Sequence, residues 1–309
     1  MKKIFLIFCF LISAQTLLAN NKLIDSLRTE LERTDNPAQR FYILNRISDI
    51  KNFQADKIDS AIVVEMLNIA EELNNDSLMA VCYNLIGLYF FNKGDNNTSL
   101  EYLIKGIPLA EKVNDKRRIS SLYFDISMVY FNLYSYEEAY KNILKGGENL
   151  PDRSFQFYDY MLVQYQRNMT MYFIFTNQTD SALKYAQELL ETSKRIKSIL
   201  FEFAAMYLNG SVYTMTGNNE KAELYFNKAI AISDSIKSQE EKMKFYESYI
   251  EYLIKNNKTN EALEQARQLM NLAIQTNDIN LKMSGSGYLR LIYDKMNNTD
   301  SAYYYSKIE

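Results

Sequence analysis

Small and apolar residues recur at spacings of three and four along most of the chain, with polar residues between them. The pattern is clearest around a Gly217-Asn218-Asn219 turn. Gly210 and Tyr213 precede this turn, and Ala222 and Phe226 follow it. Such spacings put the apolar side chains on one face of a helix, so the stretch predicts two amphipathic helices joined in a hairpin.

The hairpin pattern repeats at a nearly constant length. Alignment on the small residue equivalent to Ala222 gives Ala61, Ser99, Ala139, Ala182, Ala222, Ala262 and Ala302, which are almost evenly spaced. The predicted helix pairs are 41–53 with 59–73, 78–92 with 99–113, 120–133 with 137–150, 155–175 with 181–196, 200–215 with 221–236, and 240–255 with 260–276. A seventh pair starts at residue 281 and has only a short second helix, 301–309. Pro151 lies in the longest spacing, between Ala139 and Ala182, and because proline stops a helix, we expect the least regular joint there.

The stretch from 208 to 231 resembles the tetratricopeptide repeat (TPR), which carries small and aromatic residues at these offsets. The usual unit has about 34 residues, so this chain looks like the long-repeat type, of about 40 residues, in the sensory regions of bacterial signalling proteins. The resemblance implies an all-α fold, a right-handed superhelical solenoid of helix-turn-helix hairpins. It covers 38–309 as an array of about seven TPR-like repeats, the last one incomplete. Residues 20–37 are expected to form an N-terminal capping helix, since the ends of a solenoid need cover.

The amino terminus has the pattern of a secretory leader. A charged segment, Met1-Lys2-Lys3, is followed by the short apolar run IFLIFCFLISA. This run is too short for a membrane span and is typical of a signal peptide, which we expect to cover residues 1–19 and to be cleaved after Ala19. The protein is therefore predicted to be exported, and to be periplasmic or associated with the envelope. Cys9 lies inside the apolar run, so lipidation is not expected.

Composition argues against several kinds of function. The chain has 35 Lys and Arg against 38 Asp and Glu, with no basic block, which is unfavourable for nucleic-acid binding. It contains no histidine, so neither an imidazole base nor an imidazole metal ligand can form. Cys82 alone cannot build a thiolate metal site, and Gly285-Ser286-Gly287 lies in a helical pattern rather than in a phosphate loop. We predict no enzymatic activity, no cofactor and no metal.

The TPR resemblance implies that the first helix of each pair lines a concave groove. Positions one turn apart on these helices would face a bound peptide, with amides to pair with its backbone and apolar side chains to form pockets. The alternative is that Phe124, Phe131 and Tyr207 pack between neighbouring units. The groove positions given by the register are Asn84, Leu88, Phe91, Asn92, Phe124, Met128, Phe131, Asn132, Gln164, Arg167, Met171, Tyr207, Ser211 and Thr214.

An Asp-Ser-aliphatic triplet recurs six times. Most copies lie where a helix should begin, where Asp and Ser accept hydrogen bonds from the unpaired first-turn N–H groups and Asp suits the helix dipole. The triplet at Asp234 lies near a helix end and does not fit. The other reading is that the triplets resemble an acceptor motif for O-glycosylation in some exported bacterial proteins. The six triplets start at Asp25, Asp59, Asp76, Asp180, Asp234 and Asp300.

Together these patterns predict an exported, non-enzymatic TPR solenoid that binds a peptide or protein in its groove, as an adaptor or sensor. Two alternatives stay open: a structural assembly or scaffold factor of an envelope complex, and the sensory fragment of a longer signalling receptor. The short last helix carries three consecutive tyrosines. We expect Tyr304, Tyr305 and Ile308 to form an exposed docking edge, for a continuation of the chain or for self-association.

Overall fold

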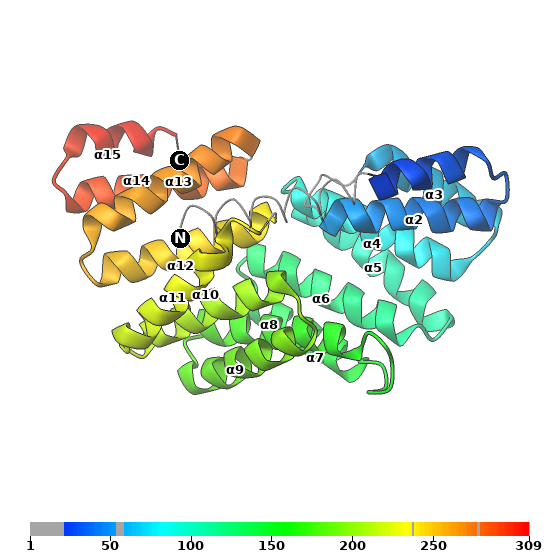
Figure 1. Cartoon of the computed structure of the whole chain (residues 1–309), viewed down its shortest axis with the longest axis horizontal. Helices are drawn as coiled ribbons and strands as arrows, with labels where there is room; N and C mark the ends of the chain where they lie inside the picture. The colour runs from blue at the N-terminus through cyan, green and yellow to red at the C-terminus, as the bar shows by residue number, and fades with distance from the viewer. Residues whose placement is uncertain (1–21, 54–58, 237, 277–278, 309) are drawn as a thin grey trace, which may run out of the picture. The chain divides into compact units, whose positions relative to one another are not determined.

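The computed structural model describes residues 22–53, 59–236, 238–276 and 279–308, and these are helices joined by turns (Figure 1). Residues 22–32 are helical. The helices after them are α2 (Pro37–Phe53), α3 (Ser60–Glu72), α4 (Asp76–Asn92), α5 (Asn96–Lys112), α6 (Lys116–Asn132), α7 (Tyr136–Glu148), α8 (Tyr158–Phe175), α9 (Thr179–Arg195), α10 (Ile199–Met215), α11 (Asn219–Ser233), α12 (Gln239–Lys255), α13 (Thr259–Thr276), α14 (Ile279–Lys295) and α15 (Thr299–Ser306). The predicted leader and its cleavage site lie outside the described residues.

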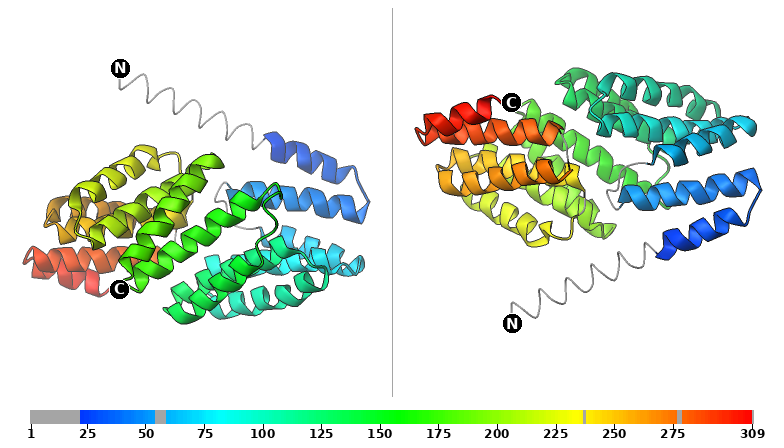
Figure 2. Two further views of the ribbon diagram at one scale, coloured as in Figure 1. Left: turned by 90° about the horizontal axis from the view of Figure 1, so that it is seen from below. Right: turned by 90° about the horizontal axis from the view of Figure 1, so that it is seen from above.

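The chain divides into two compact units between Leu133 and Tyr134. The first unit holds the helix at 22–32 and α2 to α6, and the second holds α7 to α15. Within each unit, successive helices run back and forth as hairpins (Figures 1 and 2). The all-α repeat architecture predicted from the sequence is confirmed.

Most helix boundaries lie within three residues of the sequence prediction, and the largest differences are at α2 and α6, which begin four residues earlier than predicted. The segment predicted to begin α8 at residue 155 is not helical until Tyr158. Helix α7 ends at Glu148, just before Pro151, so the irregular joint lies where the proline predicted it. Proline removes a backbone donor and clashes with the preceding turn, and the connection to α8 is consequently longer than the others.

The repeat register is set by distance from the cap, the residue that immediately precedes each second helix. The fourth residue after the cap is buried in α5, α7, α9, α11, α13 and α15, where it is Ser99, Ala139, Ala182, Ala222, Ala262 and Ala302. In α3 the cap is Asp59, so the equivalent residue is Val63, which is 3% exposed. The alignment on Ala61 was therefore wrong, since Ala61 is exposed.

Most turns between helices share one geometry, with a single residue in the left-handed region between the last residue of one helix and the cap of the next. Asparagine or glycine occupies seven of the nine described positions of this kind, Asn74, Gly94, Asn114, Asn177, Gly217, Asn257 and Asn297. These residues reach positive φ at the lowest cost. The other two are Tyr134 (φ 55°) and Lys197 (φ 54°).

Tyr134 should therefore be a site where substitution stabilises the protein. Its side chain is 80% exposed, so little packing is lost when it is replaced. We expect Tyr134→Asn to raise the free energy of unfolding by about 1 kcal/mol, because strain in the left-handed region is relieved. Gly217→Ala should lower the free energy of unfolding by a similar amount, because Gly217 has φ 73° and the added Cβ would enter open space, so backbone strain is the main change. Urea unfolding measures both, and equal signs for the two changes would contradict this account.

The capping interpretation of the Asp-Ser-aliphatic triplets holds in part. Asp59 caps α3 by accepting a hydrogen bond from the Ala61 N–H. Asp76, Asp180 and Asp300 lie instead in the first turn of their helices, one or two residues after the cap. There a carboxylate favours the helix dipole without capping. Asp234 is at the C-terminal end of α11, as its position in the sequence indicated.

A stacked aromatic pair closes four of the hairpins. In each pair the two rings have the same separation along the chain and are nearly parallel, with centroids 5.5–5.9 Å apart: Phe90 with Tyr102, Phe173 with Tyr185, Tyr213 with Tyr225, and Tyr293 with Tyr305. Each joins the end of a first helix to the start of a second helix. Aromatic pairs of this kind add stabilisation beyond the area that they bury.

The last of these pairs changes the prediction for the C-terminal edge. Tyr305 was expected to be exposed, but it stacks on Tyr293 and is half-buried. Ile308 is half-buried too, whereas Tyr303 (63%) and Tyr304 (60%) are exposed. At the other end, Ile24 and Leu27 of the helix at 22–32 pack on α2. Docking at the C-terminal edge stays a prediction, with Tyr304 as its remaining exposed member.

Candidate functional site

The first helices of the pairs form one layer in each unit. In the first unit α4 contacts α6, and in the second unit α8 contacts α10, α10 contacts α12, and α12 contacts α14. Among the described residues, the second helices of successive pairs make no such contacts. Because the helices of the inner side of a curved array approach one another most closely, we call the first helices the inner layer.

The predicted groove residues are all on this inner layer, but they differ in accessibility. Eight are exposed or half-buried: Leu88, Phe91, Asn92, Met128, Asn132, Gln164, Arg167 and Ser211. The other six are buried: Asn84, Phe124, Phe131, Met171, Tyr207 and Thr214. The buried residues pack inside the protein. For Phe124, Phe131 and Tyr207 this agrees with the alternative interpretation of the sequence, in which they pack rather than bind a ligand. A binding role for any of the fourteen stays a prediction.

Asn84 illustrates how a predicted groove residue is used inside the first unit. Its Nδ2 donates a hydrogen bond to Asp125 Oδ2 at 2.6 Å, and its Oδ1 accepts one from Arg118 Nη1 at 2.9 Å. Arg118 and Asp125 both belong to α6, so Asn84 ties α4 to the next inner helix. The amide that was expected to pair with a peptide backbone pairs with the neighbouring repeat instead.

The side chains of Arg167 and Tyr207 also contact a neighbouring repeat, through Glu241, which was not among the predicted groove residues. The Arg167 guanidinium on α8 forms an ion pair with Glu241 Oε1 on α12. The Tyr207 hydroxyl on α10 donates to Glu241 Oε2 at 2.9 Å. The side chains of Arg167 and Glu241 are only 15% and 6% exposed. These three residues therefore link three successive inner helices.

A different set of polar groups faces accessible surface where α12 and α14 meet. Ser284 Oγ donates to Glu247 Oε1 at 2.5 Å, and Tyr288 OH donates to Glu251 Oε1 at 3.0 Å. Glu247 and Glu251 are one helical turn apart on α12, and Ser284 and Tyr288 are one turn apart on α14. We call these four residues the acidic edge. Neither glutamate forms an ion pair with a Lys or Arg in the described part of the chain.

The two carboxylates of the acidic edge differ in exposure, since Glu247 is half-buried and Glu251 is exposed. Burial is the main cause that raises the pKa of Glu247, and the nearby Glu251 charge adds to it, while the Ser284 hydrogen bond and Lys244 oppose it. Burial raises the pKa of Glu251 as well, against the Tyr288 hydrogen bond. Water reaches the Glu251 side chain, but enough protein surrounds its carboxylate to weaken solvation. Such groups gain from a nearby cation.

The sequence carried a weak signal for this edge. Glu247 and Glu251 have the spacing of four that places two side chains on one helix face. The chain contains many carboxylates on solvated helix faces, however, and the two hydroxyls that orient this pair come from the first helix of the next repeat. Only the fold brings the four together.

Other candidate chemistry is absent from the part of the chain that the structure describes. No three His, Cys, Asp or Glu residues gather there as metal ligands. Cys82 is fully buried, and burial raises the pKa of its thiol to about 12, so it is not a thiolate nucleophile at neutral pH. Within the same residues, no helix combines the length and hydrophobicity that a membrane span requires.

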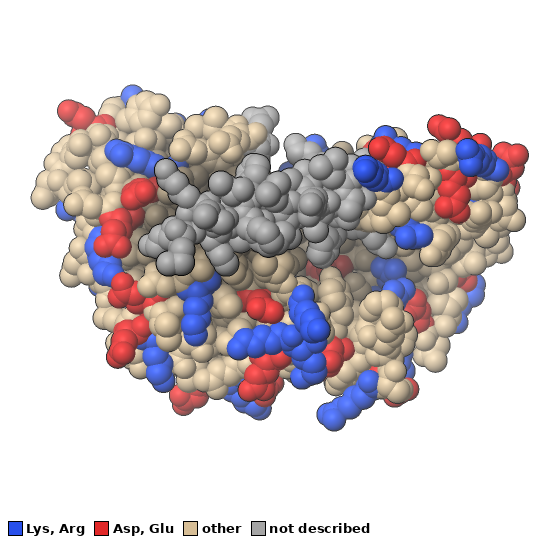
Figure 3. Space-filling model, viewed as in Figure 1, with Lys and Arg blue, Asp and Glu red and all other residues tan. Residues whose placement is uncertain are grey.

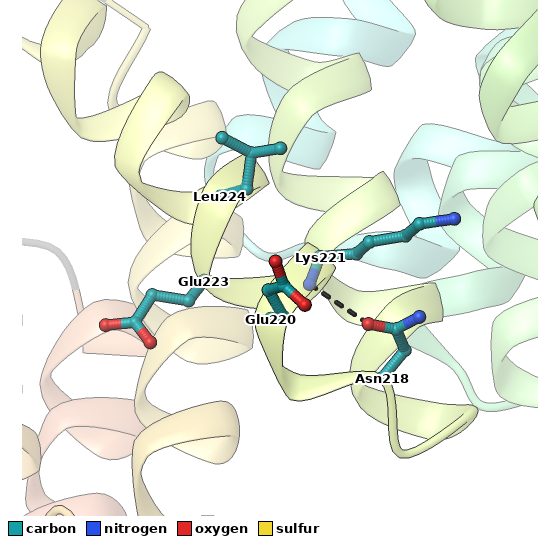
Figure 4. Close-up of a pocket in the computed structure, with 5 residues that line it drawn as sticks. All are labelled: Asn218, Glu220, Lys221, Glu223 and Leu224. Atoms are coloured by element: carbon teal, nitrogen blue, oxygen red, sulfur yellow. Dashed lines mark hydrogen bonds between the residues drawn. The ribbon is translucent and has the colours of Figure 1, made fainter.

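A surface pocket of about 510 Å³ lies at the start of α11. Figure 4 shows that the side chains lining it point in different directions, and that Asn218 is committed to capping α11 through its hydrogen bond with the Lys221 N–H. Its lining residues are all exposed. Charged side chains of both signs are interspersed over the face seen in Figure 3. Neither feature builds a ligand site.

Comparison with known proteins agrees with the repeat architecture. Residues 15–243 match the family described as the SusR N-terminal TPR domain. The chain belongs to this family. No curated protein matches the chain.

Several solved structures share the fold of this SusR-family chain. A Rap protein in complex with Competence and Sporulation Factor has a TM-score of 0.65 at 15% identity, covering 96% of both chains. The apo form of RapI has a TM-score of 0.63 at 13% identity, covering 87% of this chain and 95% of RapI. The Rap conjugation gene regulator of plasmid pLS20, in complex with the Phr* peptide, has a TM-score of 0.60 at 12% identity, over 89% of this chain and 79% of the regulator. At these identities the likeness shows the fold, and it confirms the TPR resemblance.

Proposed function

We propose that this SusR-family chain is a non-enzymatic binding protein that holds a peptide, or an extended segment of a protein, on its inner layer. The acidic edge of α12 and α14 would receive a cationic group of that ligand, the side chain of Lys or Arg. This is the chemistry favoured by two adjacent carboxylates that form no ion pair in the described part of the chain.

The acidic edge is the observation that carries the proposal. Its two carboxylates are held in place by hydroxyls from the next inner helix, so a cation would meet preoriented acceptors. A cation brought by a ligand would relieve the unfavourable burial of charge and form hydrogen bonds to both carboxylates. Two of the solved structures with this fold were determined with a bound peptide or factor, which supports a peptide as the class of ligand.

An array of random decapeptides tests the proposal. We expect the peptides that bind the protein to be enriched in Lys or Arg. For the tightest of them, Glu247→Gln combined with Glu251→Gln should weaken binding at least about tenfold, because a hydrogen bond between charged groups contributes about 1.5–3 kcal/mol and about 1.4 kcal/mol corresponds to a factor of ten.

The matched control is Glu220→Gln combined with Glu264→Gln. It removes the same charge from exposed positions of the second helices α11 and α13. Its affinity should equal that of the unchanged protein. Equal weakening by both double variants would show a general charge effect instead of a site, and an array without enrichment in basic residues would rule out the proposed ligand class.

We also propose that the protein acts after export, as a sensor. The leader pattern at Lys2 and Lys3 motivates export, and the resemblance of the repeats of about 40 residues to the sensory regions of bacterial signalling proteins motivates the sensory role. The intact mass of protein recovered from the envelope fraction should correspond to a chain that starts after Ala19. A mass that includes Met1 would contradict export with cleavage.

A further inference from the structure

Glu241 lies at the start of α12, where its sequence context predicts a local role. Ser238 is the cap of α12, and its Oγ accepts a hydrogen bond from the Glu241 N–H at 3.2 Å. A glutamate three residues after a serine cap usually turns back to the cap's own N–H. Here the carboxylate points away from the helix start, to Arg167 and Tyr207 on the two preceding inner helices.

The third position after the cap of the first helix is aromatic in the two repeats that precede α12, whereas in α6 it is Arg118. Tyr160 and Phe201 stand at the equivalent third position after the caps of α8 and α10, and their rings pack edge to face with centroids 5.4 Å apart. In α12 this position holds a buried charge in place of an aromatic ring. A local rule that is broken at a buried position points to a role beyond packing.

Both oxygens of the Glu241 carboxylate are used, and they reach two different helices. Other polar contacts described in the inner layer of the second unit join successive helices: Lys255 Nζ donates to the Thr214 carbonyl between α12 and α10, and Ser284 donates to Glu247 between α14 and α12. The ion pair of Glu241 with Arg167 instead spans from α12 to α8 across α10. It fixes the distance between two helices that are not neighbours in the array.

We infer that Glu241 is a positioning residue, which together with Arg167 and Tyr207 holds α8, α10 and α12 at one curvature of the inner layer. A buried ion pair adds little stability over apolar side chains of similar size, since desolvation offsets the attraction between the charges. The ion pair instead favours one arrangement of α8 and α12, because any other arrangement of the two helices would separate the Arg167 and Glu241 charges. This inference does not depend on the proposed ligand.

Spin-label distances within the second unit test the inference on the full chain. The labels are placed at exposed positions, Lys194→Cys on α9 and Asn271→Cys on α13. These two helices are the partners of α8 and α12, so their separation reports the distance between the first and the third of the inner helices. Cys9→Ser removes one native thiol. Cys82 is left in place, since its buried thiol is not labelled under mild conditions. The unchanged protein should give one narrow distance distribution.

The deciding variant is Arg167→Met combined with Glu241→Met. It removes both charges at similar volume and also the Glu241 acceptor of the Tyr207 hydroxyl, so the melting temperature should fall only by the effect of that one hydrogen bond, while the distance distribution broadens or shifts. Glu241→Gln keeps an acceptor for Tyr207 but removes the negative charge beside Arg167, and should broaden the distribution with a loss of stability. Lys258→Ala, which breaks the more exposed Lys258–Glu223 pair, is the control and should leave the distribution narrow. A narrow, unshifted distribution in the double methionine variant would overturn the inference.

Discussion

Replacement of Phe226 by alanine should lower the free energy of unfolding by about 3–5 kcal/mol, the range for a fully buried phenylalanine. The Phe226 side chain has no exposed surface, and its ring lies 5.1 Å from that of Tyr249 and 5.2 Å from that of Tyr252, between centroids. On its other side it covers Gly210 so closely that a Cβ there would be 2.9 Å from the ring. The cavity left by alanine is enclosed by rigid helices from two repeats and cannot collapse fully.

Leu224→Ala is the matched control for this prediction. Leu224 is also on α11 but 49% exposed, so its loss should change the free energy of unfolding by less than about 0.5 kcal/mol. Urea denaturation followed by circular dichroism measures both variants. Similar effects of the two substitutions would mean that the packing between α10, α11 and α12 differs from that described above.

Glu247→Gln should stabilise the protein at neutral pH, while it weakens peptide binding. Burial raises the pKa of Glu247 above its ordinary value of 4.5, so the folded protein favours the protonated carboxyl. The protonated Glu247 carboxyl makes its full contribution to the free energy of unfolding below pH 4.5. This contribution is lost as the pH rises through the folded-state pKa and the carboxyl becomes charged. Glutamine stays neutral at every pH and can still accept the hydrogen bond from Ser284.

The advantage of Glu247→Gln should therefore be largest at pH 7 and should disappear below about pH 4, where the native glutamate is protonated too. Lys244, Glu251 and Tyr288 also face this region, and they are unchanged in the variant. Unfolding curves at several pH values test this, with Glu264→Gln on α13 as the control of equal charge. A loss of stability at pH 7 would show that Glu247 stabilises the fold. Destabilisation by the native glutamate, combined with weaker binding by the variant, is the pattern expected of a functional residue.

The sequence was sufficient for the helices because each of their signals is local. The spacing around Gly210 and Ala222 predicted one hairpin, and the repeat length placed the others within a few residues. Gly210 could be seen as a small residue, but its partner Phe226 lies on the following helix and is identified only by the close packing. The error at Ala61 arose because the register was taken from residue type, whereas burial depends on the distance from the cap at Asp59.

The candidate site was less accessible to sequence analysis for a physical reason. A position on the inner layer can turn toward a ligand or toward the neighbouring helix, and the side chain that decides this comes from another repeat. Arg167 satisfied every sequence criterion for the groove, yet Glu241, 74 residues ahead, occupies it. Glu247 was not distinguished from the exposed carboxylates because Ser284, which orients it, is 37 residues ahead.

Photo-cross-linking of a bound peptide tests the central claim most directly. A peptide selected from the array would carry a photoreactive residue next to its Lys or Arg, and the cross-linked residues would be mapped by mass spectrometry. We predict cross-links on α12 and α14, around Glu247, Glu251 and Tyr288, and their loss in the Glu247→Gln/Glu251→Gln variant. Cross-links confined to the second helices α9, α11 and α13 would contradict the account.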